Sequence, residues 1–531
     1  MEKFQNDLVE HIDVQGTGTL QDAHLATAAE HDTTLRQALK QWKWAVAWSL
    51  LSMSIIMEGY DTALIGNLYG YPAFIRAFGT YSESSGYQLS GQWQIALGVL
   101  GSVGAFVGAL LNGYFLRHFG FRPVFMGSLV LMAAFIPISV FGNSVSLQVV
   151  GQALCGLPWG IFATMGPAYA SEILPLALRP YLTAYTNMCF AIGQFIAAGV
   201  LQGTINVNGE WSFRIPFAVQ WAWPGFLLVL GFFMPESPWW LVRKGRLDKA
   251  AASVRRLMTH PDDIQVRQLI ALMEHTNAME EAATKGSTYL DCFRGTNRRR
   301  TEIACVIFAG QVLSGSQFAY SSTYFFEQAG MSADNAYKLS LGGTAIAFVG
   351  TIASWFLMGN LGHRVHYLGG LAVMNTCLLI IGALSVKEDD NAAIWAAAAM
   401  CIIWLLAFSL SIGPVGWTIP AEVSSTRLRS KTIVLARNTY YVSAIVANFV
   451  EPKLINPTEA NLRGKTGFVW FGLGTLTLIW GYFRMPETSR RTFGELDIMF
   501  EKRLPTRKFA TYRVNEFAQE GEGGREEVAT A

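Results

Sequence analysis

Residues 169–180 read YASEILPLALRP, and residues 419–430 read IPAEVSSTRLRS. Each segment has a glutamate followed seven residues later by an arginine, namely Glu172 and Arg179, then Glu422 and Arg429. A second repeat has nearly the same separation, with MPESPWW at 234–240 and MPETSRR at 485–491. Self-similarity at a fixed separation indicates a duplicated structural unit. The sequence therefore predicts two halves of similar structure.

The composition places these halves in a membrane. Hydrophobic residues make up 51% of the chain and charged residues only 15%, whereas soluble domains are about 25% charged. A membrane-spanning helix needs about 20 apolar residues. Twelve such runs occur, at 44–66, 93–115, 123–142, 147–170, 182–203, 213–234, 301–326, 339–358, 367–385, 395–421, 432–452 and 467–485. We expect an all-α membrane protein of twelve transmembrane helices, six in each half.

The polar segments divide the chain between and around these runs. The predicted parts are an N-terminal tail 1–43, a six-helix half 44–234, a central loop 235–300, a second six-helix half 301–485 and a C-terminal tail 486–531. In the loop, apolar residues at three-and-four spacing predict short helices at 248–258 and 263–282. The segment EGEGGREE at 520–527 is expected to be disordered. Lysine and arginine concentrate on the side of the tails and central loop, which predicts that both termini are cytoplasmic.

The stretch MEGYDTALIGN at 57–67 holds two carboxylates, Glu58 and Asp61, within the first apolar run. Three residues apart, they share one helix face. A charge at bilayer depth is costly unless it faces the protein interior or a water-filled cavity. We interpret the pair as a proton-coupling site, and a permanently paired structural acid is the alternative. Arg437 offers a counter-charge, unless it belongs to the cytoplasmic cluster of Arg427, Arg429 and Lys431.

Polar residues in other spans suggest a sugar site. Amides and hydroxyls match the hydroxyls of a sugar, and aromatic faces cover its C–H faces. The candidates are Gln152, Asn187, Gln194, Gln311, Ser314, Gln317, Tyr320 and Trp417. Any single glutamine here could equally form a hydrogen bond between helices. The glycines of the second span, Gly101, Gly104 and Gly108, are better explained by close helix packing.

Charged residues at helix ends suggest cytoplasmic gates, whose salt bridges hold one access state and break in the other. The candidates are Glu172, Arg179, Glu236, Glu422, Arg429 and Glu487. The sequence contains no P-loop, nucleophile elbow or metal-like Cys/His cluster. We therefore expect no enzyme activity, no metal and no cofactor.

At these residues the sequence resembles the sugar porter family of the major facilitator superfamily, and among its members the fungal maltose and general α-glucoside permeases most closely. The resemblance covers roughly residues 55–500 and includes EGYDTALIGNLYGYPAF from 58, PESPWWL from 235, SSTRLRSKTIVLARNTY from 424 and PETSRRTF from 486. It implies a twelve-helix fold, a central sugar site and proton symport across the plasma membrane. It assigns Glu58 and Asp61 to proton coupling, and it places Gln194, Gln311, Gln317 and Trp417 at the sugar.

Several positions depart from the family pattern, among them Gln317, which replaces the more usual asparagine. Arg117 and His118 stand where the superfamily has Asp-Arg or Asp-Lys, and Gln152 replaces the arginine of hexose/proton symporters. Ala105 occupies a position where maltose symporters carry a further acid. These departures leave an uncoupled sugar facilitator as an alternative to a proton symporter. A sugar sensor that signals through its tails and central loop is a second alternative.

The predicted function is proton-coupled uptake of a disaccharide through the plasma membrane by alternating access. The sugar could be an α-glucoside such as maltose, or a β-linked disaccharide such as lactose or cellobiose, because linkage is read by cavity shape. The expected partners are the sugar, protons and membrane lipid. We expect no nucleic acid, and we expect a monomer.

Overall fold

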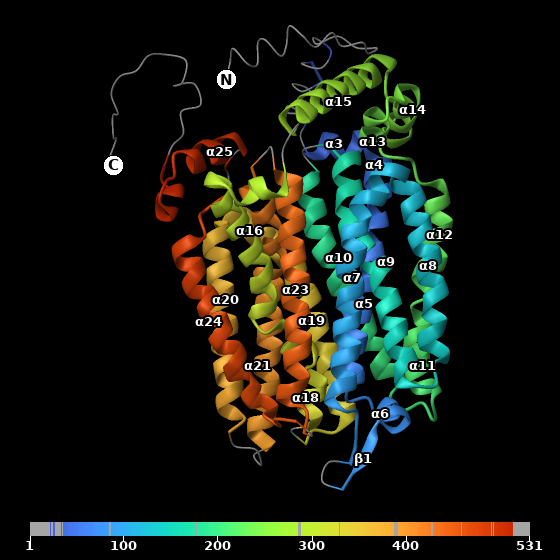
Figure 1. Ribbon diagram of the computed structural model, residues 1–531, viewed down its shortest axis with the longest axis vertical. Helices are drawn as coiled ribbons and strands as arrows, with labels where there is room; N and C mark the ends of the chain where they lie inside the picture. The colour runs from blue at the N-terminus through green and yellow to red at the C-terminus, as the bar shows by residue number, and fades with distance from the viewer. Residues whose placement is uncertain are drawn as a thin grey trace.

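A computed structural model of the protein is a long bundle of helices (Figure 1). It describes residues 35–512 except 84–85, 176–177, 285–287, 329, 387–390, 426–427, 458, 490 and 492, together with Asp22, Leu25, Ala26 and Thr33. The disorder predicted for residues 520–527 falls outside this described part, as does most of the predicted tail 1–43.

The first six spans run from α4 to α12. The first span is three consecutive helices, and the sixth is divided in two. Their bounds are α4 (Lys43–Ser49), η1 (Leu50–Ser54), α5 (Ile55–Leu68), α7 (Gly91–Phe119), α8 (Phe121–Phe141), α9 (Val145–Ile173), α10 (Arg179–Thr204), α11 (Trp211–Val219) and α12 (Ala222–Phe233).

The second six spans repeat this plan from α16 to α24. The seventh span is again three helices, and the tenth is divided in two. Their bounds are α16 (Gly295–Leu313), α17 (Ser316–Tyr320), α18 (Ser322–Gln328), α19 (Ala333–Asn360), α20 (His363–Leu384), α21 (Asn391–Leu410), α22 (Ile412–Val423), α23 (Arg429–Ile455) and α24 (Thr466–Arg484). Each of the twelve predicted runs is represented by helix in the described residues.

Short elements cover the two ends of the bundle, which we name the α15 end and the β1 end (Figure 1). The α15 end carries α3 (Leu35–Gln41), α13 (Pro238–Arg243), α14 (Leu247–Leu257), α15 (Asp263–Thr284), η2 (Tyr289–Phe293), α25 (Phe493–Glu501) and η4 (Thr506–Phe509). The β1 end carries α6 (Pro72–Phe78) and the antiparallel hairpin β1 (Thr80–Ser82) and β2 (Gly86–Gln88), with η3 (Arg463–Lys465) joining α23 to α24. The two helices predicted in the central loop are α14 and α15.

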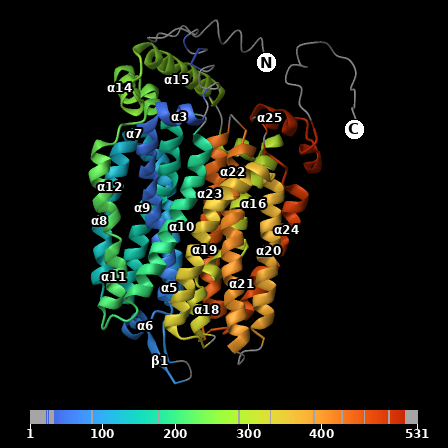
Figure 2. The same cartoon turned by 180° about the vertical axis from the view of Figure 1, so that it is seen from behind.

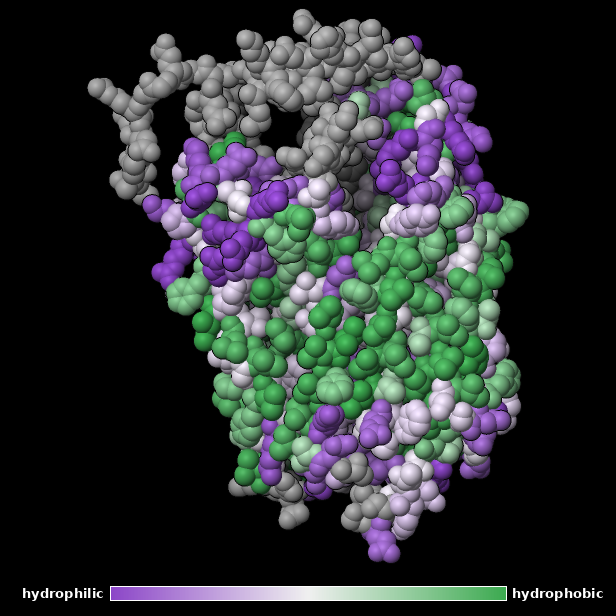
Figure 3. Space-filling view, in the orientation of Figure 1, coloured by the Kyte–Doolittle hydropathy of each residue, from purple (hydrophilic) through white to green (hydrophobic). Residues whose placement is uncertain are grey.

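The outer surface is that of a multi-pass membrane protein. Hydrophobic residues cover the middle of the bundle, whereas hydrophilic residues gather toward its two ends (Figure 3). Among the described residues, ten helical spans are individually long and apolar enough to cross a bilayer. The two predicted spans that are not among these ten are the first span, which η1 interrupts, and the fifth span, α10. The predicted twelve-helix fold is confirmed.

Glycine determines how closely the helices of the first half approach one another. A Cβ added at Gly104 or Gly108 of α7 would collide with backbone atoms of α9, and one added at Gly156 or Gly160 of α9 would collide with α7. Only the lack of a side chain permits this distance. The packing role predicted for the glycines of the second span is therefore confirmed for Gly104 and Gly108.

The two halves lie side by side when the bundle is seen from either face (Figures 1 and 2). They meet where α7 packs on α23 and where α10 packs on α19. Both contacts join a helix of the first half to one of the second. The space between the halves is therefore bordered by α5, α7 and α10 on one side and by α17 and α23 on the other.

Candidate substrate and coupling site

A cavity of about 110 Å³ lies between the two halves, and we call it the central cavity. It is lined from α5, α7, α9 and α10 of the first half and from α17 and α23 of the second. Six predicted site residues line it, namely Glu58, Asp61, Gln152, Gln194, Gln317 and Tyr320. The structure thus brings both predicted coupling acids and half of the predicted sugar ligands to one space.

Glu58 lies opposite the predicted counter-charge. Arg437 Nη2 donates to Glu58 Oε1 over 3.5 Å, and both side chains are buried. The second oxygen, Glu58 Oε2, has no hydrogen-bond partner among the described residues. A buried carboxylate with one weakly held oxygen gains less from its ion pair than one bound by both oxygens. Arg437 therefore reaches Glu58, as one of the two interpretations of the sequence expected.

Aromatic rings surround the guanidinium of Arg437. Its Cζ lies 4.6 Å from the ring centroid of Trp417, 4.5 Å from that of Tyr440 and 4.7 Å from that of Tyr441. The same guanidinium donates to the Tyr441 hydroxyl over 3.3 Å. Desolvated cation–π contacts are worth about 2 kcal/mol each. The rings, together with Glu58, therefore compensate this cation for the loss of water.

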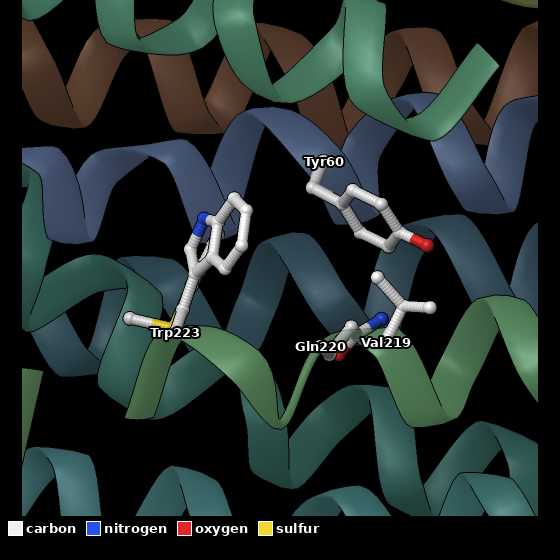
Figure 4. A pocket seen from close by; sticks show the side chains of 5 residues that line it. Tyr60, Val219, Gln220 and Trp223 are labelled. Carbon is white, nitrogen blue, oxygen red and sulfur yellow. The ribbon is translucent and has the colours of Figure 1, made fainter. Parts of the chain in front are cut away.

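Asp61 has a neutral partner that the sequence did not reveal. Gln220 Nε2 donates to Asp61 Oδ1 over 2.6 Å, and both residues are buried. Gln220 lies between α11 and α12, where Figure 4 shows it beside Tyr60 and Trp223 at a small cavity of about 10 Å³. The break in the sixth span frees this amide to face α5. The sequence feature that could have identified Gln220 is its position as a polar residue between Pro216 and Pro224 in an apolar run.

The other four predicted sugar ligands do not line the central cavity in this conformation. Gln311 Nε2 donates to the carbonyls of Ile412 and Gly413, over 3.3 and 3.2 Å, where α21 gives way to α22. Ser314 Oγ donates to the Gln311 carbonyl over 3.0 Å. Trp417 packs on Arg437, and Asn187 lies against Gly413. All four contact the breaks or the coupling arginine, so their role toward sugar stays a prediction.

Several cavity residues were not anticipated from the sequence. They are polar or aromatic and comprise Tyr69, Ser102, Trp159, Tyr440, Tyr441 and Asn448. On α23, the residues Arg437, Tyr441, Ala444 and Asn448 follow one another at spacings of four, three and four. This spacing marks one helix face, and it could have identified the lining of α23. The tyrosines resemble ordinary core residues in an apolar run, which is why they were missed.

At the α15 end, two glutamates bind the first turns of helices in an equivalent way. Glu236 accepts from the backbone N–H groups of Phe121 and Arg122 over 2.8 and 3.2 Å. Glu487 accepts from those of His363 and Arg364 over the same distances. A carboxylate at a helix N-terminus is stabilised by the free N–H groups and the helix dipole. Burial raises the pKa of Glu236, and its N–H donors oppose that rise.

The repeated glutamates next to these contacts have partners that the sequence did not predict. Glu172 accepts from Arg243 and from the Ser237 hydroxyl, and Glu422 lies 3.1 Å from His363 Nδ1. The side chain of Arg179 is outside the described part, and Arg429 lies partly buried at the start of α23. Glu172 is thus bound by residues of the central loop, whereas His363 lies in the same half as Glu422. Arg117 and His118 are exposed, and His118 Nδ1 contacts the Tyr114 carbonyl.

Hydrogen bonds between the halves close the β1 end. Thr323 donates to Asn67 Oδ1, and the Tyr337 hydroxyl donates to the Asn67 carbonyl. Asn456 Nδ2 donates to the Leu89 carbonyl over 2.9 Å. In each case the two partners come from different halves. These bonds join the two halves on the β1 side of the bundle in this conformation.

A duplicated bundle of twelve spans, with a polar cavity between its halves, is the architecture of a membrane transporter. Residues 47–500 match the family described as Sugar (and other) transporter. The chain belongs to this family, so it is a sugar porter of the major facilitator superfamily and not an enzyme.

The curated relatives are yeast permeases. The chain is 38% identical over 505 residues to the general alpha-glucoside permease of Saccharomyces cerevisiae. This alignment covers 94% of this chain and 82% of the relative. It is 39% identical over 507 residues to the maltose permease MAL31 of the same yeast, with the same coverage. These proteins are transporters of sugars, and this chain is likewise a sugar transporter.

Solved structures show the same fold. The proton:xylose symporter XylE bound to 6-bromo-6-deoxy-D-glucose superposes with a TM-score of 0.69 at 19% identity, covering 86% of this chain and 99% of that one. A partially occluded inward-open form of XylE from E. coli gives a TM-score of 0.70 at 18% identity, covering 85% and 100%. At this level of identity the likeness concerns the fold alone.

Proposed function

We propose that this protein takes up an α-glucoside disaccharide together with a proton across the plasma membrane. The observation that carries the proposal is the position of Glu58 and Asp61, which line the same cavity as Gln152, Gln194 and Gln317. Proton and sugar thus bind in one space between the two halves. One conformational equilibrium is then biased by both ligands, which is what coupling requires.

The contacts of the acids suggest how coupling works. Protonation of Glu58 removes its attraction for Arg437, and protonation of Asp61 leaves its hydrogen bond from Gln220 without a charged acceptor. The first change alters a contact between the two halves, and the second alters a contact of α5, which lines the central cavity. The proton therefore changes the relative stability of the open-out and open-in states, and the sugar selects the state in which Gln152, Gln194, Gln317 and Tyr320 converge on it.

The sugar is proposed to be an α-linked disaccharide. Yeast relatives over most of the chain are named alpha-glucoside and maltose permeases, and this favours the α-glucosides over lactose and cellobiose. The lining supports a pyranose ligand, because it combines amides with the rings of Trp159, Tyr320 and Tyr440. Amides exchange hydrogen bonds with sugar hydroxyls, and rings cover the C–H faces.

The orientation of the bundle follows from charge. Basic residues concentrate in the α15-end elements and the tails, so we assign this end to the cytoplasm. The hydrogen bonds of Asn67, Thr323 and Tyr337 at the β1 end then form the closed outer gate. Glu172, Glu236, Glu422 and Glu487 belong to the inner gate, which must rearrange when the outer side opens.

An uncoupled sugar facilitator is the second candidate, favoured by one observation. Gln152 and Ala105 both line the central cavity, at positions where the sequence comparison with coupled symporters expected an arginine and an acid. The number of charged groups in the cavity is thereby reduced. A facilitator equilibrates sugar without accumulating it, so the two candidates differ in a directly measurable way.

Uptake of labelled maltose, lactose and cellobiose by a transporter-null yeast, with external pH recorded, tests the proposal. We expect maltose to accumulate above its external concentration and to alkalinise the medium. Asp61→Asn should abolish the alkalinisation, whereas Glu210→Gln should not, because Glu210 is an exposed glutamate remote from the cavity. Equilibration without accumulation, insensitive to a protonophore, would establish the facilitator instead.

A further inference from the structure

A second buried acid lies on the β1 side of the coupling pair. Glu451 of α23 is only 4% exposed. Its Oε2 accepts from Trp470 Nε1 of α24 over 2.6 Å, while Oε1 has no hydrogen-bond partner in the part of the chain that the structure describes. Glu451 also forms no ion pair with any described residue. A carboxylate in this position is expensive to keep charged and is usually retained for a function.

Glu451 lines a small cavity of about 10 Å³, here called the outer cavity, together with Tyr69, Gln94, Gln317, Tyr324 and Asn448 among others. Four residues line both it and the central cavity, namely Tyr69, Gln317, Ser321 and Asn448. The two cavities are therefore neighbours separated by a shared wall. A space of this size suits one water molecule and is far too small for a pyranose ring.

One face of α23 connects the coupling pair to this acid. Arg437, Tyr441, Ala444, Asn448 and Glu451 recur at spacings of three and four, which places them along one side of the helix. Arg437 and Glu451 stand at opposite ends of this row, about 21 Å apart at 1.5 Å per residue. Asn448, which lines both cavities, lies one turn from Glu451.

Among the described residues that line the outer cavity, Glu451 is the only acid. Tyr69 of α5 and Tyr324 of α18 are the other titratable groups that line it, α7 contributes Gln94, and α24 contributes Trp470. Neither lysine nor arginine lines it among the described residues. The amides and hydroxyls can each donate to or accept from a water, so they support a hydrogen-bonded path without holding a charge of their own.

We propose that Glu451 is the outer proton acceptor of the coupling path, an inference that rests on the proton symport proposed above. With the outer side open, the Glu451 carboxylate takes a proton from external water and becomes a neutral acid. It then gives that proton to a water in the outer cavity, and water in the neighbouring central cavity carries a proton on to Asp61 or Glu58, which line that cavity. Glu451 returns to its anionic form, and no other bond changes.

Glu451→Gln tests the proposal, because the amide oxygen can still accept from Trp470 but cannot carry the proton. We expect sugar-induced proton influx and uphill uptake of maltose, or of whichever sugar the panel favours, to fall about tenfold or more. Sugar counterflow in proteoliposomes, which needs no net proton transfer, should stay within about twofold of the unmodified protein. Glu451→Asp, which restores a carboxyl group, should recover part of the influx.

A further variant separates a proton path from a packing role. Trp470→Phe removes the hydrogen bond that Glu451→Gln can retain, but it keeps the carboxyl group, so it should retain pH-dependent proton influx. An equal loss of influx in Trp470→Phe and Glu451→Gln would overturn the proposal, as would unchanged influx and an unchanged pH profile in Glu451→Gln. If the unmodified protein shows no sugar-induced proton influx, the proposed symport itself fails. If the unmodified protein does show this influx and Glu451→Gln shows it equally, the symport stands and only the role of Glu451 is wrong.

Discussion

At the scale of single residues, Arg437 has the most constrained environment of the coupling site. Glu58 and the rings of Trp417, Tyr440 and Tyr441 contact it from different elements. The carboxylate supplies charge, and the rings supply polarisable surface in place of water. Removing one charge of this buried pair therefore leaves the other without its main compensation.

We predict that Glu58→Gln and Arg437→Gln each lower stability by about 3 kcal/mol or more, because each leaves one buried charge uncompensated. The double variant should lose less than the sum, since it buries no charge. Thermal unfolding of the three purified proteins, read as a double-mutant cycle, measures the coupling energy. Additive losses would show that the 3.5 Å contact contributes nothing to the fold.

The sequence allowed these residues to be identified only in part. Glu58, Asp61 and Arg437 stand out because charges are rare in apolar runs, and the structure brings all three to the same place. Gln220 and Tyr441 were missed, because their partners come from spans far away in the chain. Periodicity within one span carries no information about which spans meet, so contacts between spans require the tertiary structure.

At the scale of elements, the discontinuous helices organise the site. Gly315, with φ of +91°, separates α16 from α17 and directs Gln317 and Tyr320 into the central cavity. The Gln311 amide donates to the carbonyls of Ile412 and Gly413 at the start of α22, just after the break in the tenth span. Two glutamines in the same predicted span thus differ in role. The sequence could not distinguish them, because both are amides in an apolar run.

Substitution of these two glutamines should have opposite consequences. Gln317→Leu should raise the KM for sugar with little loss of stability, because Gln317 lines the cavity. Gln311→Leu should remove both hydrogen bonds to the start of α22 and lower stability by about 1–3 kcal/mol, with the KM of the folded fraction little changed. Initial uptake rates and thermal unfolding of each variant provide the comparison. A large rise in KM for Gln311→Leu would instead support the sugar contact predicted from the sequence.

The contact between α7 and α9 makes a second prediction at this scale. Gly104→Val should reduce the yield of folded protein strongly, because its Cβ would meet the Ala153 carbonyl and lie 3.0 Å from the Gly156 Cα. Gly113→Val on the same helix is the matched control, since no atom lies within 4 Å of its added Cβ. Fluorescence size-exclusion profiles of tagged protein measure both. Equal yields would contradict the close packing.

At the scale of the whole molecule, the closed outer end should depend on few hydrogen bonds between the halves. Tyr337→Phe removes the bond to Asn67 and should favour opening on that side. Opening is measured by placing a cysteine in the cavity lining with Ser102→Cys and labelling it with a membrane-impermeant thiol reagent added outside. Labelling of the protein that carries both Ser102→Cys and Tyr337→Phe should be several-fold higher than that of the protein with Ser102→Cys alone. Thr344→Ala should have no effect, because Thr344 bonds within its own helix.

The global architecture could be predicted from the sequence far better than the gates. Twelve apolar runs and two repeats were enough for the number of spans and the duplication, since both depend on local composition. The gate partners of Glu172 and Glu422 were not predicted. His363 and Arg243 lie at other helix ends, and only the folded halves bring them near.

The charges of the coupling site also determine how the membrane potential acts on it. With both acids ionised, Glu58, Asp61 and Arg437 together carry one net negative charge, and one bound proton makes the group neutral. A potential that is negative inside drives a negative charge outward, by about 2.3 kcal/mol per 100 mV for one elementary charge crossing the full field. In the proposed symport, the voltage therefore acts on the return of the empty, deprotonated carrier, while the sugar-loaded carrier crosses without an electrical contribution from these three residues.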